Sequence, residues 1–330
     1  MRPALCALFA STLALAAGIP AACADPGSAA QAVDDESAVG WSIEADPSQR
    51  AKNMVQLSFT RRTASSHWMH SHTRPIEGLG GLTAAQLGSD SGTPADFRFE
   101  RDSGTISCTG IVGRWRGTGE CGFRANAGFA AALAERGHGR ADGRQLFSLA
   151  LYDIGFAFLD ELKRQGYAPA GVADLVRAAE HGVDLAYLKG MGGRGYRVGS
   201  LAALIRMRDH GVTPDYVSEL ARLGLADLSA GDVVRLRDHG VTPGFAAGFR
   251  AAGYALPPEQ LIRLRDHGVT LDYLRDLKAL GYGGLSADEM VQLRSHGVGA
   301  DFIRRVNASG GGRRSAAELV ALRSGGWAER

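Results

Sequence analysis

Near residue 126 the spacing of apolar positions changes. Beyond it, apolar residues recur three and four positions apart in short runs, as on one face of a helix. Five of these runs end in His-Gly-Val, and the triplets are spaced by 29, 29, 28 and 29 residues. The same period brings seven aromatic residues into register: Phe129, Phe158, Tyr187, Tyr216, Phe245, Tyr273 and Phe302. A fixed period of this length indicates a repeat architecture.

Each unit predicts two short helices with defined ends. Ser286 is a suitable N-cap for the first helix, and Glu289 three residues later completes a capping box. Gly297, inside a His-Gly-Val triplet, supplies the left-handed residue that ends this helix, and Thr213-Pro214 is a typical start for the second. Helices of about nine residues are too short to be stable alone, so the pairs must stack on one another. The prediction is an α-solenoid of seven short helical hairpins over residues 126–330.

Before the repeats, over residues 40–125, the period is two. Residues 54–59 and 97–99 alternate between apolar and polar, and further alternating stretches follow. This pattern predicts a small antiparallel β domain of about five or six strands. The connection over residues 78–92 includes one expected helical turn from Thr83 to Leu87. The predicted fold class is therefore α+β multidomain, with the β domain followed by the solenoid.

The first 24 residues have the features of a signal peptide. A basic Arg2 precedes an apolar run, and the segment ends in Ala22-Cys23-Ala24. We expect cleavage after Ala24; lipidation of Cys23 is the alternative, although Pro20 stands where a lipobox has leucine. Residues 25–39 are small and acidic, which predicts a flexible linker. With no later apolar run long enough for a transmembrane helix, a periplasmic or secreted protein is expected.

Composition, charge and motifs limit the classes of function that the sequence supports. The sequence has 37 basic and 35 acidic residues, a balance that argues against nucleic acid or an anionic membrane as partner. It contains no His-Glu-x-x-His, Gly-x-Ser-x-Gly, phosphate-binding glycine loop or Cys-x-x-Cys motif. A non-enzymatic protein without a cofactor is expected. A catalytic triad assembled from distant residues, as in an envelope hydrolase or regulator, is the alternative.

Two cysteines remain for the exported protein. Cys6 and Cys23 leave with the predicted signal peptide, whereas Cys108 and Cys121 enter an oxidising compartment. A hairpin that turns at Arg114-Trp115 places them directly opposite each other, within reach of a disulfide. We therefore predict a Cys108–Cys121 disulfide.

A histidine cluster, His67, His70 and His72, is the candidate metal site. On a strand His70 and His72 share a face, and Met69 is available to copper. No carboxylate or cysteine is placed to complete a tetrahedral set, so an exposed polar strand is the alternative interpretation. Binding of zinc or copper here would make the protein a periplasmic metal-binding protein.

Three rows of polar residues recur in the repeats. The histidines are expected to have a structural role at helix ends, where an imidazole bonds free carbonyls. The aspartates are predicted to accept hydrogen bonds from an arginine or a backbone N–H of the same or next repeat. The arginines either belong to this structural network or form a basic ridge for an acidic partner. The rows are His181, His210, His239, His267 and His296; Asp209, Asp238 and Asp266; and Arg208, Arg237, Arg265 and Arg294.

The unit Leu-Arg-Asp-His-Gly-Val-Thr-Pro, with the preceding pattern at residues 101–110 (Arg-Asp-x-Gly-x-x-x-Cys-x-Gly), resembles uncharacterised exported bacterial proteins. Similar repeats occur at the C-termini of antirepressor-class membrane zinc peptidases related to β-lactam sensors. The resemblance implies a β domain followed by repeats, and it points to no particular activity. The proteolysis and signalling of the peptidases do not carry over, because their zinc motif and membrane helices are missing from this sequence. The expected function is a binding or scaffold protein that engages an envelope protein or peptide through its helical-repeat surface.

Overall fold

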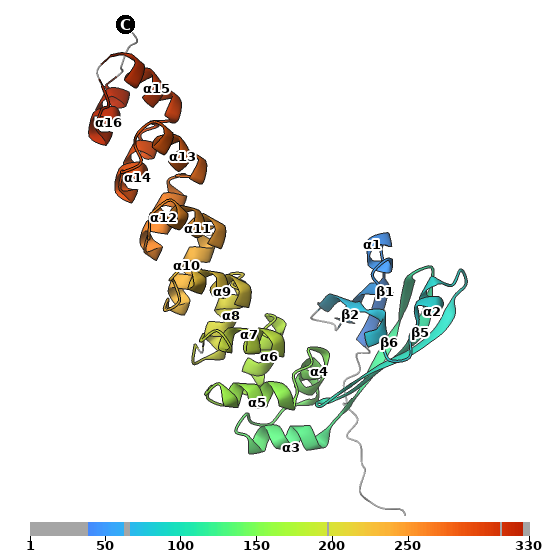
Figure 1. The fold of residues 1–330 in the computed structure, drawn as a ribbon. Helices are drawn as coiled ribbons and strands as arrows, with labels where there is room; N and C mark the ends of the chain where they lie inside the picture. Colours follow the sequence, from blue (N-terminus) through green and yellow to red (C-terminus); the bar gives the residue numbers. More distant parts are fainter. Residues whose placement is uncertain (1–38, 63–66, 197, 311, 326–330) are drawn as a thin grey trace, which may run out of the picture. The chain divides into compact units, whose positions relative to one another are not determined.

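The computed structural model describes residues 39–62, 67–196, 198–310 and 312–325. The predicted signal peptide and all but the last residue of the predicted linker lie outside these ranges. Within them the chain forms one antiparallel β domain followed by fourteen short helices (Figure 1). The α+β prediction is confirmed. None of the described helices is both long enough and apolar enough to cross a membrane.

Six strands form the β domain, in the spatial order β3-β2-β1-β6-β5-β4, and all neighbours are antiparallel. Alternate residues of β1, β2 and β4 are buried, among them Val55, Leu57 and Phe59 of β2. The predicted helical turn is present as α2, which Thr83 caps. The bounds are β1 Val39–Glu44, α1 Pro47–Arg50, β2 Met54–Arg62, β3 His67–Pro75, η1 Ile76–Gly78, α2 Ala84–Gly88, β4 Thr93–Arg101, β5 Gly104–Gly113 and β6 Arg116–Ala125.

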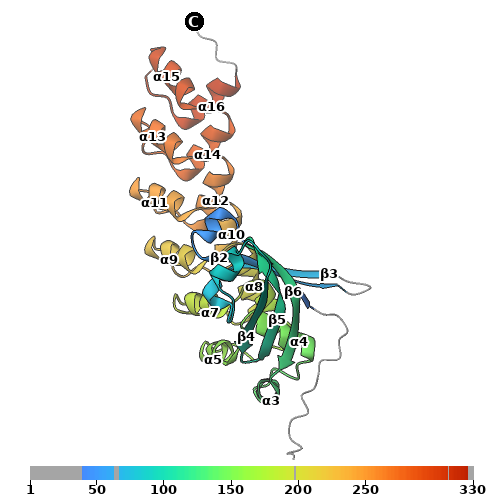
Figure 2. The same cartoon turned by 90° about the vertical axis from the view of Figure 1, so that its right-hand side faces the viewer.

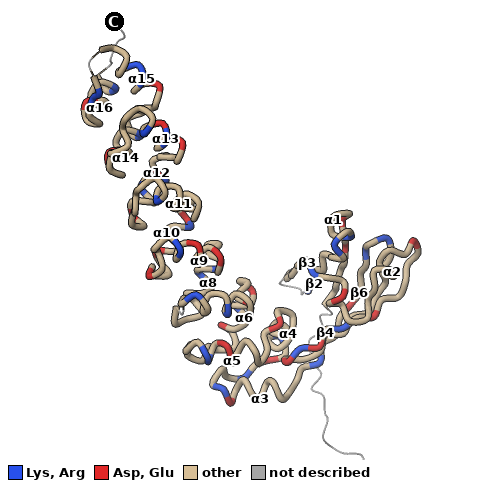
Figure 3. The backbone as a smooth tube through the Cα atoms, viewed as in Figure 1, with Lys and Arg blue, Asp and Glu red and all other residues tan. Residues whose placement is uncertain are grey.

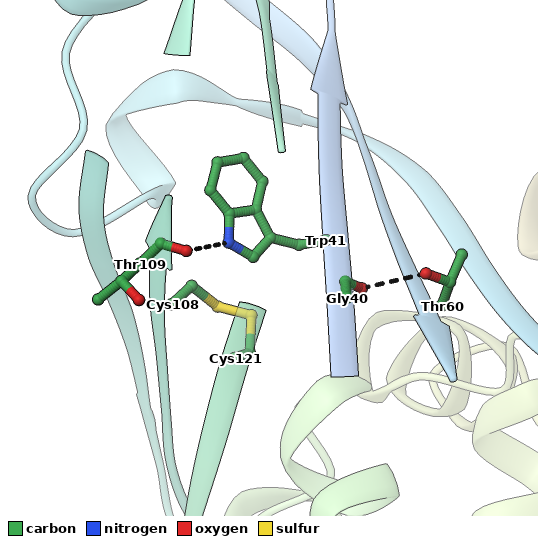
Figure 4. Close-up of a disulfide and its surroundings, with 6 residues drawn as sticks. All are labelled: Gly40, Trp41, Thr60, Cys108, Thr109 and Cys121. Carbon is green, nitrogen blue, oxygen red and sulfur yellow. Dashed lines mark hydrogen bonds between the residues drawn. A yellow bond between two sulfur atoms is a disulfide. The ribbon is translucent and has the colours of Figure 1, made fainter. Parts of the chain in front are cut away.

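The predicted disulfide joins β5 to β6. Cys108 and Cys121 are directly opposite each other in the register, with Cα atoms 4.0 Å apart and an S–S distance of 2.05 Å. The hairpin turns at Arg114 and Trp115, both with positive φ. Beside the bridge, the buried Trp41 donates its indole N–H to the Thr109 carbonyl at 3.0 Å (Figure 4). The disulfide therefore forms part of the core at the centre of the sheet.

The helices begin and end where the repeat pattern predicts. Ser286 and Glu289 form a capping box, Thr213 caps a helix with proline at its first position, and Gly297 has φ +68°. Val298 N–H bonds the Leu293 carbonyl at 2.9 Å, which completes the left-handed helix end. The helices are α3 Ala127–Glu135, α4 Gly143–Leu151, α5 Phe156–Arg164, α6 Val172–Glu180, α7 Leu185–Gly192, α8 Leu201–Asp209, α9 Pro214–Arg222, α10 Ala230–Asp238, α11 Pro243–Ala251, α12 Pro258–Asp266, α13 Leu271–Ala279, α14 Ala287–Ser295, α15 Ala300–Ala308 and α16 Ala316–Ser324.

Two rows of helices make up the repeat region. From α4 on, each even-numbered helix contacts the next even-numbered one, and from α5 on the odd-numbered helices do the same (Figure 2). All seven aromatic residues of the ladder are buried in one continuous apolar core. Because a hairpin of two such helices has little core of its own, its stability depends on the neighbouring hairpins.

The helix α4 connects the two parts of the fold because it is buried on two faces. Leu146 and Leu149 join the core of the repeats, whereas Phe147, Ala150 and Leu151 join the core of the sheet. A nearly continuous apolar sequence is what such a helix needs.

Candidate functional site

The histidine cluster lies on β3, an edge strand of the sheet. Strand alternation turns His70, His72 and Arg74 toward the side of the sheet that carries the apolar core, opposite Phe59, Leu57 and Val55 of β2. His72 Nδ1 lies 2.6 Å from His70 Nε2, and the Arg74 guanidinium contacts His72 Nε2. These three half-buried side chains form the basic cluster of β3.

Burial and mutual repulsion shift the pKa values in the basic cluster. Burial, aided by the nearby guanidinium of Arg74, lowers the pKa of His72 to about 4 and also lowers that of His70. Burial and the charge of Arg101 lower the pKa of Arg74 to about 10. Both imidazoles are therefore neutral at pH 7, and the positive charge of the cluster resides on Arg74.

The first repeat supplies neighbours that sequence reasoning missed. Tyr152 packs edge-on against His70, with ring centroids 4.5 Å apart, and burial raises the pKa of Tyr152 to about 12. Asp153, with φ +58°, pairs with Arg101 of β4 at 3.0 Å. Tyr152-Asp153-Ile154 occupies the place that His-Gly-Val has in later repeats. This departure from the repeat could have drawn attention to Tyr152 and Asp153. The sequence does not show, however, that they lie against the β domain.

For a metal ion the cluster is incomplete. His67 is exposed and lies on the opposite face of β3 from His70 and His72, so the three predicted ligands do not converge. Over the described ranges, no group of three or more His, Cys, Asp or Glu side chains is placed to hold a metal. What remains is a histidine pair beside a cation, and a cation repels an incoming metal ion.

In the repeats, the histidines and aspartates bond each other across repeat boundaries. His181 Nδ1 lies 2.7 Å from Asp209, His210 Nδ1 lies 2.6 Å from Asp238, and His239 Nδ1 lies 2.9 Å from Asp266. At the next boundary Ser295 replaces the aspartate and bonds His267 Nδ1 at 2.8 Å. The aspartates thus receive their side-chain hydrogen bond from a histidine, not from the predicted arginine or backbone N–H. His181, His210 and His239 correspondingly bond carboxylates instead of free carbonyls.

The arginine row contacts the aromatic row of the preceding repeat. Arg208 lies 5.2 Å from the ring centroid of Tyr187, and Arg237 lies 5.1 Å from that of Tyr216. Arg265 and Arg294 repeat the contact on Phe245 and Tyr273 at 5.6 and 5.2 Å, and Arg294 Nε also bonds the Gly268 carbonyl at 3.1 Å. Each guanidinium therefore has a cation–π contact that joins two repeats.

Other positions, which are exposed or half-buried, differ from repeat to repeat. The fifth residue of each odd-numbered helix is an example, and we call this set the variable row. From α5 to α15 its side chains change from acidic to basic, then to polar, apolar and basic again. Figure 3 shows that residues of both charges occur along the odd-numbered helices. The variable row consists of Asp160, Lys189, Ser218, Ala247, Arg275 and Arg304.

Comparison of the chain with protein-family models, curated proteins and solved structures found no match. Function is therefore inferred from the contacts of the chain itself.

Proposed function

We propose that this protein is a non-enzymatic, exported scaffold that binds a protein or peptide of the cell envelope along its odd-numbered helices. The observation that carries the proposal is the contrast between a constant framework and a variable surface within one repeat array. Framework contacts recur at successive boundaries, whereas the variable row carries a different side chain in almost every repeat.

The framework contacts stabilise the stack. They also occupy the hydrogen-bonding groups and ring faces of the constant residues, so these groups are not available to a ligand. Tyr216, for example, is buried, its hydroxyl bonds the Val241 carbonyl at 2.8 Å, and Arg237 lies over its ring. Constant residues of this kind set the spacing of the repeats. Specific recognition then falls to side chains that are exposed and not repeated.

A changing sequence of charges favours a partner with a unique surface. A polymer of identical units would need the same side chains at each repeat in order to bind along the array. The side chains of the variable row do not repeat, so such a polymer is a poor match. A protein or peptide presents non-repeating charges and apolar groups, which such a surface can match by complementarity. The basic end of the row, Arg275 and Arg304, fits an acidic segment of that partner.

The test combines crosslinking in the native envelope with charge reversal. Arg275→Glu with Arg304→Glu is expected to abolish capture of the partner and to leave the free energy of unfolding nearly unchanged, since each arginine forms an exposed ion pair with an aspartate of its own helix. Arg177→Glu with Arg206→Glu, on the even-numbered helices, is the matched control and should retain capture. Capture that survives the first variant and disappears in the control would place the site on the other row.

A further inference from the structure

A second tyrosine position recurs at the ends of the odd-numbered helices, directly after a left-handed glycine. Tyr167, Tyr196, Tyr254 and Tyr282 hold it in four repeats. The Tyr254 hydroxyl donates to carbonyls in the loop of the next repeat, at 3.0 Å from Gly283 O and 2.9 Å from Leu285 O. The Tyr196 hydroxyl bonds the corresponding loop carbonyl of Ala226 at 3.4 Å. The ring at this position therefore fills the junction between two repeats.

A cation from the following repeat covers this ring in two of the repeats. Lys278 Nζ lies 5.8 Å from the ring centroid of Tyr254 and donates to the Ala252 carbonyl at 2.6 Å. Arg313 lies 5.7 Å from the ring of Tyr282 and bonds the Gly281 carbonyl. The junction at Tyr254 is complete, with three parts: a tyrosine ring, a cation above it and loop carbonyls that receive the hydroxyl. The Tyr282 hydroxyl donates instead to Asn307 Oδ1 at 3.3 Å.

At the end of α9 the ring is missing. Leu225 stands in the tyrosine position, while Arg250 Nη1 donates to the Leu223 carbonyl at 2.5 Å, the contact that Lys278 makes one repeat later. A cavity of about 350 Å³ opens there, and Ala255, which corresponds to Ala226 and Gly283, is part of its wall. Leu225, Ala246, Tyr254, Leu256, Pro257 and Leu261 supply its apolar lining.

The first repeat shows the same relation at an independent place. His138 stands in the tyrosine position after α3, and a cavity of about 540 Å³ lies at the corresponding junction. There His138 Nδ1 bonds the Ala170 carbonyl at 2.8 Å, and an ion pair between Arg136 and Asp160 crosses the rim. Two cavities at equivalent places, both without the tyrosine, indicate that the missing ring is their cause.

We propose that the Leu225 cavity binds the phenol ring of a tyrosine side chain of the partner protein, in the place that Tyr254 and Tyr282 fill in their own repeats. The inference rests on the proposed function, since the ring belongs to the scaffold's partner. The chemistry that recognises it is already in place. Arg250 supplies the cationic face, the leucine and proline side chains supply apolar walls, and the Ala255 carbonyl is the acceptor expected for the hydroxyl.

The test is a titration of the full chain, with ¹³C-labelled leucine methyl groups, by N-acetyltyrosinamide. We expect saturable NMR shifts at the methyl groups of Leu225 and Leu256, and about fivefold weaker binding of N-acetylphenylalaninamide, which lacks the hydroxyl. Leu225→Tyr rebuilds the complete junction, so it should bind no probe while keeping or raising the melting temperature. Glu219→Tyr, which adds the same side chain at an exposed position of α9 outside the variable row, should bind the probe as the unmodified chain does.

A second variant keeps the inference testable if Leu225→Tyr does not fold. Arg250→Met removes the cation and retains most of the aliphatic stem, so it should weaken probe binding several-fold. Absence of saturable shifts in the unmodified chain, or undiminished shifts in Leu225→Tyr, would overturn the inference. If Leu225→Tyr captured the partner as well as the unmodified chain does, the partner's tyrosine would not bind in this cavity, and the proposed scaffold function would still stand. If the unmodified chain captured no partner but still bound the probe, the proposed scaffold function would fail and the tyrosine-binding cavity would stand.

Discussion

His210 Nδ1 lies 2.6 Å from Asp238 Oδ1, and this contact ties the end of α8 to the last turn of α10. A carboxylate at a helix C-terminus is unfavourable unless a donor compensates it, and the imidazole of the preceding repeat is that donor. Both side chains are partly exposed, at 38% and 42%, so solvent screens their attraction. The pair therefore contributes a small amount to the free energy of unfolding, and the fold does not depend on it.

Asp238→Ala is predicted to lower the free energy of unfolding by about 0.5–1 kcal/mol, as measured by urea denaturation. Asp272→Ala is the control, because Asp272 is 80% exposed and its ion pair with Arg275 lies within one helix, and it should change stability less. If Asp238→Ala left stability unchanged and abolished partner capture, the row would belong to the binding surface instead.

The hydroxyl of the buried aromatic row offers a paired test. Tyr216→Phe removes the donor to the Val241 carbonyl and is expected to cost about 1 kcal/mol, because a buried acceptor loses its bond. Phe245 occupies the same position one repeat later without a hydroxyl. Phe245→Tyr should therefore be tolerated far better than an enlargement elsewhere in the core. Equal losses in both variants would show that ring packing, and not the hydroxyl, determines the effect.

Much of the fold was predictable because local signals repeat. Each helix end carries its own chemistry, such as the serine and glutamate of Ser286 and Glu289, and the 29-residue period shows which ends are equivalent. The Cys108–Cys121 register followed from one symmetrical turn. These features depend on residues close together in the sequence, or on the period itself.

The contacts of the candidate site were less predictable, because they depend on how two different architectures meet. Nothing in the sequence places Tyr152 of the first repeat against His70 of β3. The choice of histidine over arginine as the partner of Asp238 depends on directions in which side chains leave neighbouring helices. The Leu225 cavity did have a signal, since a leucine interrupts a row of tyrosines, but only the structure shows that the ring would fill a junction.

Removal of the disulfide by Cys108→Ala with Cys121→Ala is predicted to destabilise the β domain by about 2–3 kcal/mol, the range expected for a closed loop of this size. Trp41, beside the bridge, makes fluorescence a suitable measurement during denaturation. The helical signal of the repeats should change much less than the tryptophan signal. A free-thiol assay of the unreduced protein that titrates both cysteines would contradict the bridge itself.

Zinc titration separates the metal hypothesis from the arrangement found on β3. With two histidines, no third ligand among the residues that the structure describes and Arg74 in contact, the protein is expected to bind zinc only weakly. Arg74→Gln removes the repelling charge and should tighten zinc binding by roughly tenfold, or about 1.4 kcal/mol. Tight binding by the unmodified chain that does not change in His70→Gln would point to ligands elsewhere.

The same cluster makes stability depend on pH in a defined window. The pKa of His72 falls from 6.5 to about 4 on folding, since burial and Arg74 disfavour its charged form. Between these values the unfolded chain binds more protons than the folded one, so the stabilisation is complete above pH 6.5 and is lost as the pH falls toward 4. His70 shifts in the same direction and adds to the effect.

We therefore predict that the free energy of unfolding decreases between pH 7 and pH 5, with roughly 1 kcal/mol of the loss due to His72 after allowance for its partial exposure. His72→Gln keeps a neutral polar side chain and should remove that part, so its denaturation midpoints at the two pH values lie closer together than those of the unmodified chain. His296→Gln, an exposed histidine of the repeats, is the control and should keep the full pH dependence. If His72→Gln and the unmodified chain showed the same pH dependence, His72 would be protonated as readily in the folded protein as in the unfolded chain. The basic cluster of β3 would then not disfavour the charged form of His72.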